Sequence, residues 1–435
     1  MSDTSQQAVI AGASLLIAAA AHRYLYLRLV RDITVSPRLR RAGRATAAAL
    51  TVLVPSGVLA AEYADPTRIG WLARPVFAWV ACAAYLLMAL AVLEIPRRLA
   101  VRSLARRANA GSGTSPGVDR SKATGTGTDT DTDTGPGTGT GRPTAETPGR
   151  DSVADGPWVV DRRLVLARSV ALLATTTAVA TTGYGFHRGL GPPDVKTVRI
   201  GLRRLHPSLT GMRITMACDL HLGPFFGRGH TSRIVRMIND TSPDLVAIVG
   251  DLSDGEAEDL GPHAEPLARL SSAHGTYFVT GNHDYRHDAD AWIGTLAGFR
   301  VTTLRNTRTL IKHRGGAIDL AGVTDVEGER EHDGPDYHRA LADRDRSRPV
   351  VLLAHQPVQV HQAARHGVDL QLSGHTHGGG FFPGNLLVPL SQPVTAGLAT
   401  IDGTQLYVSR GAGASVPPIR VGAPPDITVV ELHAL

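Results

Sequence analysis

The chain has 435 residues, a formal net charge of +6 and only two cysteines, Cys82 and Cys218. Two thiols in separate regions exclude a scaffold held together by disulfides, and the length allows two or three structural units. After residue 190, 23 Lys and Arg stand against 26 Asp and Glu, so this part lacks the basic excess of a nucleic-acid-binding domain and no nucleic-acid partner is expected.

Four apolar segments precede residue 190, over residues 8–30, 45–61, 71–95 and 164–186. The third is the clearest membrane-spanning candidate, because about 20 apolar residues cross a bilayer as a helix. The second and fourth also fit buried core helices. We predict a membrane region with about three transmembrane helices over residues 1–108. A fourth helix, or an anchor resembling an export signal because Arg162 and Arg163 precede it, is expected over residues 158–190.

Arginine clusters give these segments a predicted orientation. They follow the first segment, follow the third and precede the fourth: Arg31, Arg38, Arg40, Arg41, Arg44; Arg97, Arg98, Arg102, Arg106, Arg107; Arg162, Arg163. If the segments cross in turn, all three clusters lie on one side, which the positive-inside rule makes cytoplasmic. The chain is then a multi-pass cell-membrane protein with its last domain extracytoplasmic. Removing one crossing reverses that side.

Residues 109–157 are rich in Gly, Thr, Ser, Asp and Pro, and they cannot bury enough apolar surface to fold. We predict a disordered linker there. From residue 191 to 435, apolar strand-like runs alternate with helix-like segments, which is typical of a layered α/β domain. Helices are expected over residues 231–239, 264–271, 289–296 and 337–343, and further strands over 405–409 and 427–432.

Five expected strands in this region end next to polar side chains that bind metals. The strands cover residues 212–218, 244–249, 276–280, 349–354 and 368–373, and the side chains are Asp219, His221, Asp251, Asn282, His355, His375 and His377. Alone, Asp251 also fits an ordinary turn aspartate. Together, oxygen and imidazole donors without thiolate favour Mn, Fe or Zn. Their number favours two divalent metal ions that share Asp251 and act jointly on a phosphoryl group.

The motif order Asp-x-His, Gly-Asp, Gly-Asn-His-Asp, His and Gly-His-x-His resembles the calcineurin-like metallophosphoesterase family over residues 195–435. Residues 353–357, 407–411, 417–420 (Pro-Pro-Ile-Arg) and 424–428 are similar to its bacterial membrane-anchored branch. The resemblance implies an α/β (α+β layered) domain, a four-layer αββα double sheet. It also implies a binuclear centre, with Asp219, His221, Asp251 and His377 on one ion and Asp251, Asn282, His355 and His375 on the other.

The same resemblance assigns catalytic roles to His283, which would face the substrate, and to Asp284, which would fix its orientation. Asp254 fits either a supporting role or a turn. Cys218 and Gly380 depart from residues common in the family, but neither is an expected ligand.

The expected function is metal-dependent hydrolysis of a phosphomonoester, phosphodiester or pyrophosphate through an activated water, with a lipid-linked or envelope molecule among the candidate substrates. The alternatives are a non-catalytic metal-binding scaffold of the same fold and a membrane sensor.

Overall fold

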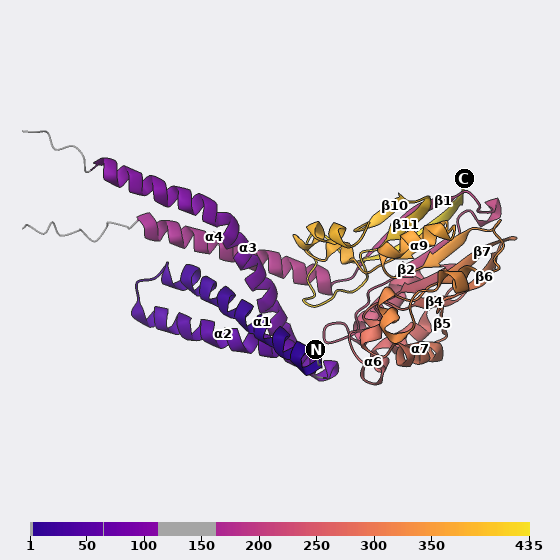
Figure 1. Cartoon of the computed structure of the whole chain (residues 1–435), viewed down its shortest axis with the longest axis horizontal. Helices are drawn as coiled ribbons and strands as arrows, with labels where there is room; N and C mark the ends of the chain where they lie inside the picture. Colours follow the sequence, from indigo (N-terminus) through magenta and orange to yellow (C-terminus); the bar gives the residue numbers. More distant parts are fainter. Residues whose placement is uncertain (1–2, 64, 112–161) are drawn as a thin grey trace, which may run out of the picture.

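The computed structural model describes residues 3–63, 65–111 and 162–435. Residues 112–157 of the predicted linker lie outside this described part. A helical region occupies one end of the molecule and a domain with two sheets the other (Figure 1).

The helical region contains α1 (Asp3–Tyr26), a π-helical turn (Leu27–Arg31), α2 (Pro37–Tyr63), α3 (Pro66–Gly111) and α4 (Arg162–Leu190). In the described part, three stretches are long and apolar enough to cross a membrane: Pro37–Ala61, Thr67–Ala100 and Leu164–Leu190. They correspond to the second, third and fourth predicted segments. The first predicted segment forms α1, which is not among the three. Helix α3 contains Pro75 and Pro96 and bends in Figure 1, as expected where proline removes a backbone hydrogen bond.

Two six-stranded sheets form the second region. The first has the order β1 (Asp194–Leu202), β12 (Asp426–Ala434), β2 (Arg213–Ala217), β3 (Leu245–Val249), β4 (Thr276–Val279), β5 (Val301–Thr303). The second has the order β10 (Gly397–Ile401), β11 (Thr404–Val408), β9 (Leu370–Ser373), β8 (Val350–Leu353), β7 (Gly316–Gly322), β6 (Thr307–His313). Strands β2, β3 and β4 are parallel to one another, as are β8 and β9, so their carboxyl ends meet at one edge of each sheet.

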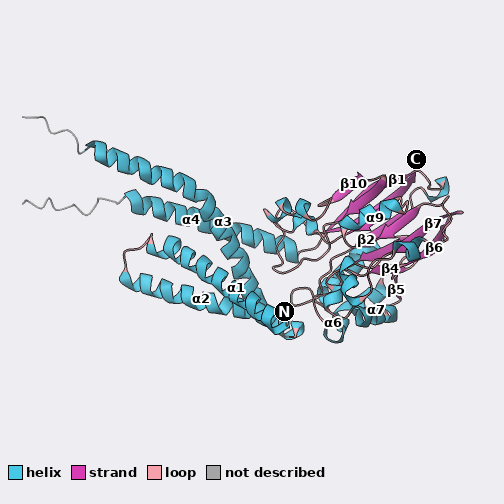
Figure 2. Cartoon of the chain, viewed as in Figure 1, coloured by secondary structure: helices cyan, strands magenta, loops and turns pink. Residues whose placement is uncertain are grey.

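The sheets pack face to face over a core that includes Met216, Val249 and Leu353. Helices α5 (Arg228–Asp240), α6 (Ala257–Ala264) and α7 (Ala289–Gly298) cover the outer face of the first sheet. Helices α8 (Tyr337–Leu341) and α9 (Val360–Arg365) cover the second (Figure 2). Burying one Leu-sized side chain contributes about 1.5–3 kcal/mol, so these three apolar layers hold the sheets in place. The predicted four-layer αββα arrangement is confirmed.

Short 3₁₀ helices occupy the connections: Pro207–Leu209, Glu265–Arg269, Asp284–Arg286, Val326–Glu331, Pro357–Gln359, His377–Gly379, Gly384–Leu386 and Val388–Leu390. Asp251 lies two residues beyond the end of β3, and Asp219 lies two residues beyond the end of β2. The strand ends therefore set the positions of the side chains that follow them.

Candidate metal centre

The structure brings all seven predicted ligand residues together at the carboxyl ends of five strands. Two groups consist of predicted ligands alone, Asp219–His221–His377 and Asp251–His355–His375, and the ligand atoms within each lie within 4.8 Å of one another. Asn282 joins the second group, because its Oδ1 lies 2.8 Å from His375 Nδ1. Strands from both sheets contribute to each group, so folding of the double sheet assembles the site.

The backbone at these positions is unusual. Asp219, His221, Asp251, His375 and His377 all have a positive φ, between 48° and 70°. Such a conformation costs a non-glycine residue about 1–3 kcal/mol and persists only where the surrounding structure enforces it. Its recurrence at five of the seven positions marks this loop cluster as a functional site.

Asp251 lies between the two groups. Its Oδ2 is 3.3 Å from His355 Nε2 in one group and 3.8 Å from His221 Nε2 in the other. Its Oδ1 accepts a hydrogen bond of 2.9 Å from the backbone N–H of His283. The His283 N–H therefore holds the carboxylate in a position from which its Oδ2 faces a histidine of each group.

His355 provides the test of whether the site suits a cation. Its Nδ1 lies 3.0 Å from the carbonyl oxygen of Val249, and among the described residues its buried Nε2 has no hydrogen-bond partner. Donation from Nδ1 directs the Nε2 lone pair toward Asp251, as in metal-binding histidines. Burial lowers the pKa of His355, but Asp251 outweighs it and raises the pKa well above its ordinary value. The site thus attracts positive charge at the position where an imidazole nitrogen meets a carboxylate, and its residues fit a divalent metal.

The group Asp219–His221–His377 also suits a cation. His221 Nε2 lies 3.0 Å from His377 Nε2, and His377 Nε2 lies 3.7 Å from Asp219 Oδ1. Burial raises the pKa of Asp219, and the nearby Asp251 raises it further, because two buried carboxylates repel each other. A cation between them would remove that repulsion.

Asp254 connects a predicted ligand to the predicted catalytic histidine. Its Oδ1 lies 2.8 Å from His221 Nδ1 and 2.7 Å from His283 Nδ1. These distances are those of hydrogen bonds, so Asp254 bonds both histidines at once. Although burial opposes its ionisation, the two histidines hold the pKa of Asp254 below its ordinary range.

The orientation of His283 differs from the expectation. Asp284, predicted to fix it, instead accepts hydrogen bonds from the backbone N–H groups of Leu252, at 2.9 Å, and Gly281, at 2.7 Å. The 3₁₀ turn that begins at Asp284 directs its side chain toward the loop of Asp251 rather than toward its neighbour. Asp254 is the carboxylate that contacts His283, and Asp284 holds the Asp251 loop.

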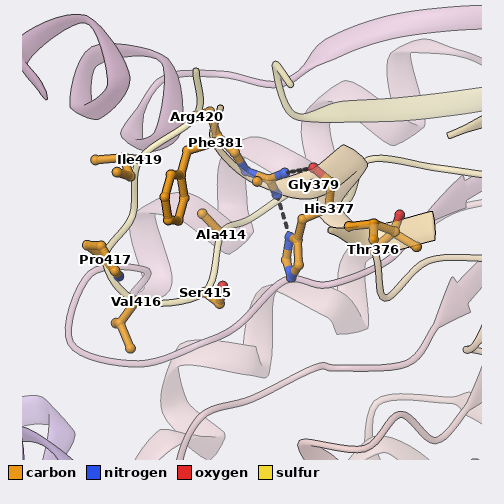
Figure 3. Close-up of a pocket in the computed structure, with 12 residues that line it drawn as sticks. Thr376, His377, Gly379, Phe381, Ala414, Ser415, Val416, Pro417, Ile419 and Arg420 are labelled. Atoms are coloured by element: carbon orange, nitrogen blue, oxygen red, sulfur yellow. Dashed lines mark hydrogen bonds between the residues drawn. The ribbon is translucent and has the colours of Figure 1, made fainter. Parts of the chain in front are cut away.

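Arg420 is a site residue that the motifs did not single out. It is 1% exposed, and it donates a 2.6 Å hydrogen bond to the carbonyl oxygen of His377 and contacts the ring of the same residue (Figure 3). It also contacts the carbonyl of Gly413. Burial and this guanidinium lower the pKa of His377 well below its ordinary value, so its imidazole stays neutral, as a metal ligand must. The only available signal was the position of Arg420 in the Pro-Pro-Ile-Arg tail motif.

Comparisons with known proteins agree with this geometry. Residues 212–379 match the calcineurin-like phosphoesterase family. A Bos taurus "transmembrane protein with metallophosphoesterase domain" is 39% identical over 63% of this chain and 64% of its own length. Its Danio rerio namesake is 37% identical over 61% of this chain and 63% of its own length. An "uncharacterized metallophosphoesterase" of Helicobacter pylori is 40% identical over 58% of this chain and 68% of its own length.

The chain thus spans somewhat less than two thirds of the two vertebrate relatives. Both relatives are named as transmembrane proteins, and in the described part of this chain three helices are apolar and long enough to cross a membrane. Together these findings make the chain a membrane protein.

Proposed function

This chain belongs to the calcineurin-like phosphoesterase family, and from that membership we propose that it is a membrane-anchored, two-metal phosphoesterase. The observation that carries the proposal is the position of Asp251 between two groups of carboxylate and imidazole ligands. One shared carboxylate is the feature that brings two divalent ions close enough to act on a single phosphoryl group.

Asp219, His221, Asp251 and His377 would hold one ion, and Asp251, Asn282, His355 and His375 the other. Mn, Fe and Zn all suit this donor set. When bound, the pair would polarise the phosphoryl oxygens and lower the pKa of a water nucleophile. Asp219 and Asp251 offset the positive charge of the ions, and Asp254 fixes the ring of His221 in the orientation that a ligand needs.

His283 would act on the substrate itself. Its Nδ1 is held by Asp254 at 2.7 Å, and its side chain is 22% exposed, so part of the ring reaches the opening of the site. A proton held at Nε2 can be donated to a phosphate oxygen or to the leaving oxygen. The guanidinium of Arg286, 3.5 Å from that nitrogen, would add a positive charge for an anionic substrate.

We further propose that the catalytic domain is extracytoplasmic and acts on a phosphate ester carried by a lipid or by another envelope molecule. In Figure 1 the turn between α1 and α2, the end of α3 and the start of α4 all lie at the end of the helical region remote from the sheets. The three arginine clusters adjoin these points, which supports a cytoplasmic location for that end. Anchoring also raises the local concentration of a membrane-borne substrate.

The test uses the full chain in detergent, loaded with Mn²⁺, and measures hydrolysis of p-nitrophenyl phosphate and bis-p-nitrophenyl phosphate. Asp251→Asn is expected to lose metal and activity together. Asp402→Asn is the matched control, because Asp402 has nearly the same φ, 51° against 49°, and lies exposed in the turn between β10 and β11. Two bound metals without turnover, under every divalent metal tried, would instead favour the non-catalytic scaffold.

A further inference from the structure

An apolar segment follows the ligand His377 and leads toward β10. This segment, Phe381–Leu390, exposes Phe382 by 49%, Leu386 by 64%, Leu387 by 65% and Leu390 by 83%. No charged residue occurs between Gly378 and Thr400. Contiguous exposed apolar surface of this kind marks contact with a partner or a membrane rather than with water.

The neighbours of the segment indicate which of these covers it. Tyr85, in the apolar part of α3, donates a hydrogen bond of 3.3 Å to the carbonyl of Phe382, and its ring meets that of Phe381 edge-on. Ile419, from the adjoining loop, packs with Ala174 and Ala178 of α4. The two short helices within Phe381–Leu390 lie on the side of the domain that faces α3 and α4 (Figure 1). The exposed surface of the segment is thus continuous with helices that themselves need lipid around them.

We propose that Phe381–Leu390 is embedded in the lipid bilayer beside α3 and holds the mouth of the metal centre against the lipid headgroups. Apolar side chains at an interface gain free energy by entering the acyl region, in proportion to the area that leaves water. Only three glycines, Gly378, Gly379 and Gly380, separate His377 from this segment. A membrane contact here therefore fixes the distance between the metal centre and the bilayer surface.

A cavity of about 190 Å³ lies between the proposed metal ligand His377 and the apolar segment that begins at Phe381. His377 and Arg420 line one side, and Phe381, Val416 and Ile419 line the other (Figure 3). The side with polar groups suits an anionic phosphate ester and the apolar side suits a hydrocarbon chain. This extension, that the preferred substrate carries a lipid chain, rests on the proposed phosphoesterase function.

The proposed position of Phe381–Leu390 in the bilayer is tested with the full chain reconstituted into lipid nanodiscs. A Cys82→Ala background leaves only Cys218, which is fully buried. A polarity-sensitive fluorophore is attached at Leu390→Cys and, as control, at Leu310→Cys. Leu310 is also an exposed leucine, but it lies on β6, at the far end of the domain from the helices (Figure 1). Lipid-borne quenchers should quench the label at position 390 and not at 310, and aqueous iodide the reverse. Equal iodide quenching at both positions overturns the proposal.

The proposed preference for a substrate with a lipid chain is tested with two probes that share the same reacting bond, ethyl p-nitrophenyl phosphate and hexadecyl p-nitrophenyl phosphate. In the Leu386→Asp/Leu390→Asp variant, hydrolysis of the ethyl probe should be unchanged. The preference for the hexadecyl probe should fall by roughly tenfold or more, because a carboxylate is expelled from the acyl region. The Leu310→Asp control should keep both rates. An unchanged preference in the double variant overturns the extension. Failure of the unsubstituted chain on both probes would count against the proposed function, and the quenching result would still decide the location.

Discussion

His283 is the residue whose replacement separates proton transfer from metal binding. Its ring nitrogen Nδ1 is bonded to Asp254, and it belongs to neither of the two ligand groups that surround Asp251. A His283→Gln change keeps a polar side chain of similar reach but removes the titratable nitrogen. We therefore expect both metals to remain bound and the rate of the chemical step to fall.

The size of the fall should depend on the leaving group. General acid catalysis contributes about 10²–10⁴-fold, so hydrolysis of an alkyl phosphate, whose leaving alkoxide needs a proton, should slow by that factor. This corresponds to about 2.7–5.4 kcal/mol of transition-state stabilisation. p-Nitrophenolate leaves without a proton, so the loss on p-nitrophenyl phosphate should stay below about tenfold.

The assay compares kcat for the two substrates by phosphate release, with metal content measured on the same sample. His287→Gln is the matched control, since His287 lies on the same loop and, in the described structure, its side chain hydrogen-bonds only to Glu256. An equal loss on both substrates, or a loss of metal, would refute the assignment of His283 as the proton donor.

Three further predictions follow from single features. Gly281→Ala should remove metal and activity, because the added Cβ would overlap the backbone nitrogen and Oδ1 of Asp251, whereas Gly294→Ala, which meets nothing within 4 Å in the described structure, should leave metal content unchanged. His230 is buried without charge, and burial lowers its pKa to about 4. The neutral histidine should make its full contribution to the free energy of unfolding above the pKa of about 6.5 that His230 has in the unfolded chain. As the pH falls from there toward 4, that free energy should decrease by on the order of 3 kcal/mol. The midpoint temperature of thermal unfolding should therefore fall less over that pH range in the His230→Gln variant than in the unsubstituted chain. An equal fall in both would contradict this prediction. Finally, a reporter enzyme that works only outside the cytoplasm should be active when fused after Leu435, and a cytoplasmic signal would reverse the predicted orientation.

The fold and the ligand cluster could be predicted because short sequence motifs mark both the strands and the ligands that follow them. Each ligand follows an apolar strand, and parallel strands deliver their carboxyl ends to the same edge. The family prediction is confirmed by the 40% identity to the Helicobacter pylori metallophosphoesterase over 68% of that protein, together with the family match over residues 212–379. The double sheet is confirmed by its strand order. All seven ligand residues meet in the structure, and their binding of metal stays a prediction.

The partners of these residues could not be predicted, because they depend on loop geometry and on contacts distant in the chain. Asp284 is adjacent to His283 but turns toward Gly281, while Asp254 reaches His283 from another loop. Arg420 contacts His377 across 43 positions of sequence. The exposed apolar segment Phe381–Leu390 could not be predicted, since its exposure is a property of the folded surface.

A crystal structure of the metal-loaded chain, with anomalous scattering at the metal edge, tests most directly whether Asp251 holds two cations. We expect two peaks about 3.5–4 Å apart, with a carboxylate oxygen of Asp251 bound to each. A single peak, or two peaks that do not share Asp251, would contradict it.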